Sequence, residues 1–220
     1  MKIYSLIFIF IIKLSMKLYI SDQHFFHDTI ITLDKRNFED SRAMNKYMLE
    51  QWNSKVQGGD QVIVLGDMFF SKEAEQVNYI LKRLNGKIYL IEGNHDCSWL
   101  KKEGVKLERF EWIKPYAELT DGKRQVILSH YPVFCYNHQH LINEDGSPRT
   151  FMLYGHVHNT SDENLVNQFI KITQKTKIQS RGKEISIPCN MINCFCKFSD
   201  YIPLSLDEWI ELDVKRRGQM

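Results

Sequence analysis

The chain has 220 residues, which is long enough for one sizeable domain with a buried core. Apolar residues make up 43% and charged residues 25%, which is ordinary globular usage and excludes disordered, collagen-like and coiled-coil chains. The formal net charge of +2 indicates no clear patch for nucleic acid.

The N-terminal residues include Leu6–Ile12, seven consecutive apolar residues. Seven is far short of the roughly 20 that a membrane-spanning helix needs, so we expect no stable membrane span. Because Met16 directly precedes a predicted strand, we interpret 1–15 as an apolar extension from a mis-assigned start and 16–220 as a single domain. A signal peptide and weak membrane contact are the alternatives.

The cysteines are odd in number, five in all, and form no C-x-x-C pair. This pattern argues against a secreted disulfide framework and against a thiolate zinc site. We therefore expect reduced cysteines and a cytoplasmic protein.

Hydrophobic periodicity predicts strands that alternate with helices. Strands are expected over 17–20, 61–65, 87–91, 125–129, 151–154 and 185–198. Helices are expected over 41–55, with Ser41 as a candidate cap, over 72–84, ended by Asn85-Gly86, and over 162–173 within a polar excursion, 159–184. The alternation is typical of an α/β fold, in which ligands bind at the carboxyl ends of the strands.

Polar clusters follow five of these strands. They are Asp22-Gln23-His24, Gly66-Asp67, Gly93-Asn94-His95-Asp96, Ser129-His130 and Gly155-His156-Val157-His158. If the backbone kinks at a strand end, two residues separated by one position can both turn toward the same site, which suits the D-x-H and H-x-H spacings. The neighbouring glycines permit the unusual φ and ψ angles of such a kink. One buried histidine is usually a core residue, but burying all of these without a charge partner would be costly.

The donor types in these clusters match a pair of metal ions. Two divalent ions about 3.5–4 Å apart need around eight N and O contacts, with one bridging carboxylate. Two aspartates, one asparagine and four histidines are offered: Asp22, Asp67, Asn94, His24, His130, His156 and His158. If one aspartate bridges, the contacts number eight. Mn²⁺ is the favoured ion, and Fe, Zn or Ni also suit this donor set.

The five clusters, in this order, resemble the signature of the calcineurin-like metallophosphoesterase superfamily: D-x-H, G-D, G-N-H-[D/E], H and G-H-x-H. Flanking segments such as Ser129-His-Tyr-Pro132 are similar to its small, single-domain bacterial and phage-type members, over residues 16–210. The resemblance implies a four-layer α/β/β/α sandwich with two mixed sheets face to face, helices outside and the metals at one edge.

The resemblance also implies which residues hold each ion. The first would be bound by Asp22, His24 and His158, and the second by Asn94, His130 and His156. Asp67 would bridge the two, and a hydroxide activated by the binuclear centre would be the nucleophile.

Two further residues of the third cluster receive roles from the same resemblance. His95 would not bind metal but would face the substrate phosphate, as transition-state stabiliser or general acid. Asp96 would orient and charge the His95 imidazole.

His27 and Arg36 lie beyond the first cluster, near places where the resembling small family often has a histidine and an arginine. They either clamp the substrate phosphate or belong to a solvated loop. His138 and His140 match no motif and are expected at the surface.

Departures from the family pattern narrow the predicted activity. Protein Ser/Thr phosphatases of the superfamily follow G-D with an arginine-containing run and have G-N-H-E, whereas here Met68-Phe69-Phe70 follows and Asp96 replaces glutamate. We expect a metal-dependent phosphoric ester hydrolase acting on a small-molecule phosphodiester. The alternatives are a phosphomonoesterase for a nucleotide or sugar phosphate, and a non-catalytic scaffold, as in the superfamily's retromer subunit. The sequence indicates neither the natural substrate nor the oligomeric state.

Overall fold

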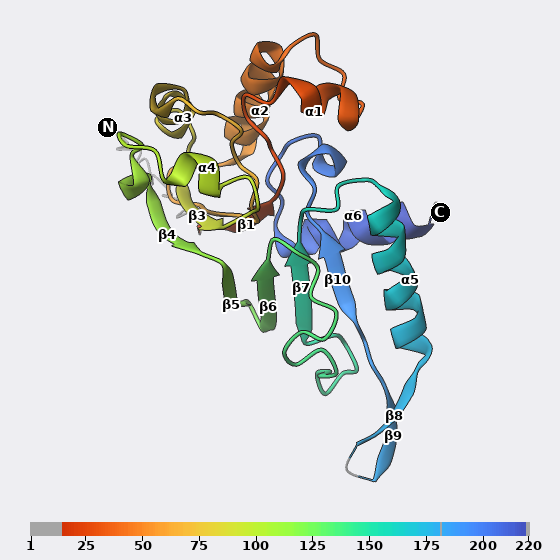
Figure 1. Ribbon diagram of the computed structural model, residues 1–220. Helices are drawn as coiled ribbons and strands as arrows, with labels where there is room; N and C mark the ends of the chain where they lie inside the picture. Colours follow the sequence, from red (N-terminus) through yellow and green to blue (C-terminus); the bar gives the residue numbers. More distant parts are fainter. Residues whose placement is uncertain (1–14, 181, 219–220) are drawn as a thin grey trace, which may run out of the picture.

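The computed structural model describes residues 15–180 and 182–218. In this part of the chain, two four-stranded sheets lie at the centre (Figure 1). The first sheet is parallel throughout, in the order β1 (Lys17–Ile20), β2 (Gln61–Val64), β3 (Lys87–Ile91) and β4 (Phe110–Lys114). The second has the order β10 (Asn190–Asn193), β7 (Thr150–Tyr154), β6 (Arg124–Ser129) and β5 (Tyr116–Asp121). Within these two sheets only β5 and β6 pair antiparallel, so one sheet is mixed, whereas the family resemblance implied two mixed sheets.

The other elements of the described residues are helices, 3₁₀ turns and one hairpin. They are α1 (Asp28–Leu33), α2 (Ser41–Lys55), α3 (Ala74–Leu81), α4 (Cys97–Leu100), α5 (Ser161–Lys175) and α6 (Leu206–Gly218), the 3₁₀ turns Leu107–Arg109 and Cys196–Ser199, and the hairpin of β8 (Lys177–Ser180) and β9 (Lys183–Ser186).

Alternation along the strands divides the buried side chains into three layers. In β1, Leu18 faces the layer beneath α2 and α3, while Tyr19 faces the layer between the two sheets. In β7, Leu153 faces that same middle layer, while Met152 faces α5. Helices therefore cover the outer face of each sheet, which confirms the predicted four-layer α/β/β/α arrangement.

Helix α2 confirms the predicted span 41–55 but begins differently from expectation. The side chain of Asp40, not Ser41, accepts the capping hydrogen bond from the amide of Ala43, at 2.7 Å. The buried residues Met44, Met48 and Trp52 recur every four positions and pack on the first sheet.

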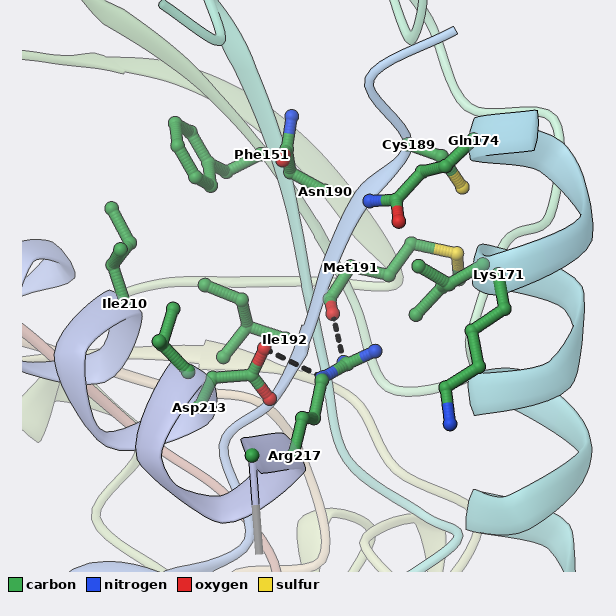
Figure 2. A pocket seen from close by; sticks show the side chains of 13 residues that line it. Phe151, Lys171, Gln174, Cys189, Asn190, Met191, Ile192, Ile210, Asp213 and Arg217 are labelled. Atoms are coloured by element: carbon green, nitrogen blue, oxygen red, sulfur yellow. Dashed lines mark hydrogen bonds and ion pairs between the residues drawn. The ribbon is translucent and has the colours of Figure 1, made fainter. Parts of the chain in front are cut away.

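The predicted long strand over 185–198 is wrong. Pro188 interrupts it, because proline has no amide hydrogen for a strand ladder, and Cys189 adopts a positive φ of 46°. The segment splits into β9, the short β10 and a 3₁₀ turn. Beside β10 runs α6, which the sequence analysis did not predict. Figure 2 shows how Arg217 joins the two: its Nη2 donates to the carbonyl of Met191 at 2.7 Å and its Nε pairs with Asp213.

The expected apolar extension lies almost entirely outside the described residues, which begin at Ser15. Within 15–180 and 182–218, none of the helices combines the length and the apolar character required to cross a bilayer.

Candidate metal centre

The polar clusters of five strands meet at one edge of the sandwich. Direct backbone bonds join the loops: the amide of Asp22 donates to Gly66 at 3.0 Å, and the amide of Gly155 donates to His130 at 2.9 Å. Two groups of side chains in the described chain bring their donor atoms within 4.8 Å of one another: Asp22, His24 and His158, and Asp22, Asp67 and His130. The expectation that the strand-end clusters converge is confirmed.

The backbone kinks at the residues that carry these donors, as the D-x-H and H-x-H spacings predicted. Left-handed φ values occur at Asp22 (58°), His24 (53°), Asp67 (54°), His156 (70°) and His158 (47°). A non-glycine residue in this conformation is strained by on the order of 1 kcal/mol, so these five residues concentrate backbone strain at one site. Neighbouring loops hold the strained backbone in place, since the amide of His24 donates to the Asp67 carbonyl at 3.0 Å and that of His156 to Asp22 Oδ1 at 3.0 Å.

Two glycines are required by the closeness of these loops. Gly66 has a φ of +91°, and a Cβ there would lie 2.8 Å from Cα of Gly93 and from Cγ of His130, and nearer still to Nδ1 of that ring. At Gly93, a Cβ would lie 2.9 Å from Cγ of Asp67 and nearer still to its amide. The loops that present Asp67 and Asn94 can approach one another only without side chains at these two positions.

The spacing of the donor atoms suits coordination of metal ions. Nε2 of His24 and Nε2 of His158 lie 3.3 Å apart. Oδ1 of Asn94 lies 3.0 Å from Nε2 of His130 and 2.9 Å from Nδ1 of His156. Adjacent ligands on an ion with bonds of about 2.1 Å are about 3 Å apart, so both sets fit a cation.

Hydrogen bonds on the far sides of two imidazoles determine which nitrogen faces the centre. Nδ1 of His130 donates to the carbonyl of Leu65 at 2.8 Å, and Nδ1 of His158 donates to Oδ1 of Asp34 at 2.7 Å. In each ring Nε2 is then the nitrogen that faces the centre: it lies 3.5 Å from Asp67 in His130 and 3.5 Å from Asp22 in His158.

The electrostatics of the site also favour a bound positive charge. Burial alone would raise the pKa of Asp22, but hydrogen bonding to His158 and the charges of His158, His130 and His24 hold it well below its usual range. Burial would lower the pKa of His130, yet Asp67 and Asp22 outweigh it and raise the pKa to about 9. His158 is likewise raised to about 9, by Asp22 and Asp34. These imidazoles hold protons where a divalent cation would satisfy the same carboxylates, so the residues present fit a metal.

The family model for the calcineurin-like phosphoesterase superfamily domain matches residues 16–171 of this chain. The chain belongs to this superfamily. An uncharacterized protein of Methanocaldococcus jannaschii is 32% identical over 194 residues, which cover 88% of each chain. The crystal structure of a protein of unknown function from Aquifex aeolicus has the same fold, with a TM-score of 0.53 and 22% identity, and the match covers 90% of this chain and all of that one. Membership in the superfamily and the Asp/His groups together support a metal-dependent phosphoesterase.

The hydrogen-bond partners of the Asp96 carboxylate are backbone amides and Trp99 rather than the His95 imidazole, so its expected action on His95 stays a prediction. Its buried carboxylate accepts hydrogen bonds from the amides of Asp67 (2.8 Å), Gly93 (2.8 Å) and Met68 (3.0 Å) and from Nε1 of Trp99 (2.8 Å). With four donors, both oxygens are fully used. Burial and the charge of Asp67 raise the pKa of Asp96 to about 6, against these hydrogen bonds. The Asp96 carboxylate therefore links the loop that carries Asp67 to the loop that carries Asn94 by hydrogen bonds.

His95 faces the open side of the centre. Its side chain is 40% exposed, and Nε2 lies 3.9 Å from Oδ2 of Asp67. The backbone is held by the amide of His95, which donates to Oδ1 of Asp67 at 2.8 Å. The ring therefore stands beside the candidate metal ligands with its edge free to meet a substrate.

His27 and Arg36 have different environments. His27 lies next to the centre, with Nδ1 3.2 Å from Nδ1 of His24 and its ring stacked on Phe70 at 3.7 Å. Arg36 is only 4% exposed and donates to the carbonyls of Asp22 (2.9 Å) and Gln23 (2.7 Å) and to Oδ2 of Asp34. Its guanidinium is engaged by these acceptors and Arg36 does not line the cleft over the centre, so the phosphate contact stays a prediction that this geometry disfavours.

Asp34 is the residue of the centre that the sequence analysis missed. It links Arg36 to His158 through its two carboxylate oxygens. A signal was available, since each metal-binding histidine needs a partner for its other nitrogen and an acidic residue stands two positions before Arg36. His138 and His140 line neither the centre nor its cleft, and His138 bonds instead to Gln125, 2.6 Å away.

A cleft of about 540 Å³ opens over the centre. One wall is apolar and includes Ile30, Leu33 and Phe70, while Thr160 and Asp162 stand at the start of α5. Within the described residues, none of the side chains that line this cleft belongs to a lysine or an arginine.

Proposed function

We propose that this phosphoesterase hydrolyses phosphodiesters. The supporting observation is that neither lysine nor arginine is among the residues that line the cleft, together with the engagement of Arg36 by backbone carbonyls. A terminal phosphate monoester carries close to two negative charges and is commonly held by arginine, whereas a diester carries one. A cleft lined by neither lysine nor arginine therefore suits the diester better.

We assign the metal ligands on the donor spacing. Asp22, His24 and His158 would hold one ion, Asn94, His130 and His156 the other, and Asp67 would lie between them. The preferred ions are two Mn²⁺, with Fe, Zn or Ni as substitutes, because the set mixes carboxylate, amide and imidazole donors. When bound, such ions neutralise the phosphate and lower the pKa of water.

The remaining residues of the cleft act on the substrate. His95 would donate a hydrogen bond to the phosphoryl group or a proton to the leaving oxygen. His27, fixed between His24 and Phe70, would line the phosphate position. The apolar wall at Leu33 and Phe70 would receive an ester group, which is the part of a diester that a monoester lacks.

We also propose that residues 16–220 form one domain and that the protein works in the cytoplasm. The compartment is supported by the five cysteines, none of which is paired in a disulfide among the described residues, as is usual in a reducing compartment.

Hydrolysis of bis-p-nitrophenyl phosphate and of p-nitrophenyl phosphate tests the proposal. Metal-stripped protein would receive Mn²⁺, Fe²⁺, Zn²⁺ or Ni²⁺ in turn, beside Asp67→Ala and His95→Ala. We expect metal-dependent diester cleavage, lost by at least about 100-fold in both variants. Preference for the monoester would replace the proposal with a phosphomonoesterase. Two bound ions without any turnover would identify a scaffold.

A further inference from the structure

Helix α5 carries apolar side chains on the side that faces away from the sheets. Leu165 is 59% exposed and Ile172 66% exposed, and the half-buried Phe169 lies between them. Phe134, which is 43% exposed, stacks on Phe169 with ring centroids 4.3 Å apart. We name these four residues the α5 seam. Figure 1 shows α5 at the edge of the molecule, away from the first sheet, and the exposed fractions show that the described residues leave Leu165 and Ile172 largely uncovered.

The inward face of α5 packs on the core of the monomer, and the half-buried Phe169, at the flank of this face, also contacts that core. Val166 and Ile170 are buried against the second sheet. A helix that only covers a sheet needs one apolar stripe, and its opposite face is normally polar. The second stripe at Leu165, Phe169 and Ile172 follows the spacing i, i+4, i+7, which indicates a surface that packs against another helix.

The seam is complementary to itself when two copies run antiparallel. If a two-fold axis passes between Gln168 and Phe169, Leu165 of one helix stands opposite Ile172 of the other. The two Phe169 rings then lie beside the axis, where each is backed by its own Phe134. A two-fold interface requires this kind of matching: if one residue contacts a second residue of the other copy, the same contact occurs again with the two copies exchanged.

The charges at the ends of the helix favour the same direction. Asp162 is exposed in the first turn and Lys175 is exposed in the last. Antiparallel pairing brings the acidic end of each helix to the basic end of the other and opposes the helix dipoles, whereas parallel pairing would bring like charges together.

We propose that the α5 seam is a homodimer interface, in which two copies of this chain pack their α5 helices antiparallel. The helix has 15 residues, so its length is about 22 Å. A contact of this size is at the low end for stable interfaces, so the dimer is expected to dissociate in the micromolar range. The proposal does not depend on the metal centre or on the reaction.

Sedimentation of the full chain from about 1 to 200 µM tests the interface, because this range brackets the expected dissociation constant. We expect a concentration-dependent dimer, and at least about a tenfold weaker association in Leu165→Glu and Ile172→Glu. Val214→Glu is the matched control, since Val214 is an equally exposed apolar residue, 67%, on α6 rather than α5. Circular dichroism would verify that all three variants are folded.

Disulfide formation tests the direction of the helices. The background is Cys97→Ser with Cys135→Ser, which removes the exposed thiols and leaves the three buried ones. Oxidation of Leu165→Cys with Ile172→Cys should link two chains. Leu165→Cys alone should not, because antiparallel pairing displaces the two copies of that residue by about 10 Å along the helices.

Three results would overturn the proposal. One is a monomer over the whole concentration range, including a monomer in which another part of the same chain covers Leu165. Another is a dimer that the two seam variants weaken no more than Val214→Glu does. The third is efficient crosslinking of Leu165→Cys alone, which would show parallel helices or a different surface.

Discussion

Oδ1 of Asp34 lies 2.7 Å from Nδ1 of His158, and Oδ2 of the same carboxylate accepts hydrogen bonds from Arg36. Arg36 in turn donates to the carbonyls of Asp22 and Gln23. One carboxylate thus connects the loop after β1 with an imidazole delivered by β7. The chain Arg36, Asp34, His158 fixes the orientation of His158 relative to Asp22, which is its neighbour in the candidate centre.

Asp34→Asn should weaken metal binding. The amide is a poorer acceptor for the His158 imidazole and leaves that ring less basic and less firmly oriented, so Mn²⁺ affinity should fall about 10–100-fold. Isothermal titration of metal-stripped protein measures this directly. Asp162→Asn is the control, since Asp162 also lines the cleft but is not paired with an imidazole there. Equal losses in both variants would contradict the role of Asp34.

Arg36→Met should destabilise the protein without a specific effect on substrate binding. The change leaves the carbonyls of Asp22 and Gln23 without their buried donor and removes the partner of Asp34, which should cost about 2–4 kcal/mol in free energy of unfolding. Urea denaturation measures the loss, and Arg42→Met at an exposed position should change stability by less than about 0.5 kcal/mol. A raised KM with unchanged stability would instead restore Arg36 as a phosphate clamp.

Gly93→Ala should destabilise the fold by about 2–3 kcal/mol. The added methyl would meet the amide and side chain of Asp67, and neither can move because both belong to the hydrogen-bonded loops of the centre. Gly58→Ala is the matched control, because open space surrounds that position and its φ lies outside the left-handed region. It should be neutral or stabilising by up to about 1 kcal/mol. Similar unfolding midpoints for the two variants would refute the close approach.

Metal-free protein should lose stability as the pH rises from 6.5 to 9. The folded state raises the pKa of His130 and of His158 from 6.5 to about 9, so it binds more protons than the unfolded state in this range. The stabilisation is complete below pH 6.5 and disappears as the pH passes 9. Thermal unfolding should show a fall in Tm of at least about 5 °C.

Saturating Mn²⁺ should reverse that slope, because the metal binds the deprotonated imidazoles and competes with protons at low pH. A metal-free Tm that stays level or rises between pH 6.5 and 9 would contradict the raised pKa values of the two histidines.

Much of the fold was predictable because local signals agreed with tertiary packing. The buried strands end at polar clusters, and the helix over 41–55 has its apolar residues four apart. The hydrophobic periodicity and the places of the polar clusters therefore both predicted an α/β sandwich. The prediction failed over 185–198, where one proline outweighed an apolar, β-prone composition. The helix Leu206–Gly218 was missed although Asp207 and Glu208 begin it and three basic residues end it, which is a typical pattern of helix charges.

The sequence by itself determined which donor atoms this protein could offer and that parallel strands would bring them to one edge. Only the tertiary structure decided what each side chain does there. Asp96 and His95 are adjacent in sequence, yet one braces two loops and the other faces the cleft. Arg36 and Asp34 both act on residues more than ten positions away. A side chain has a limited number of hydrogen-bond donors, and a donor that already binds buried carbonyls cannot also bind a substrate. Which partner it meets depends on how distant loops pack, and no local pattern records that.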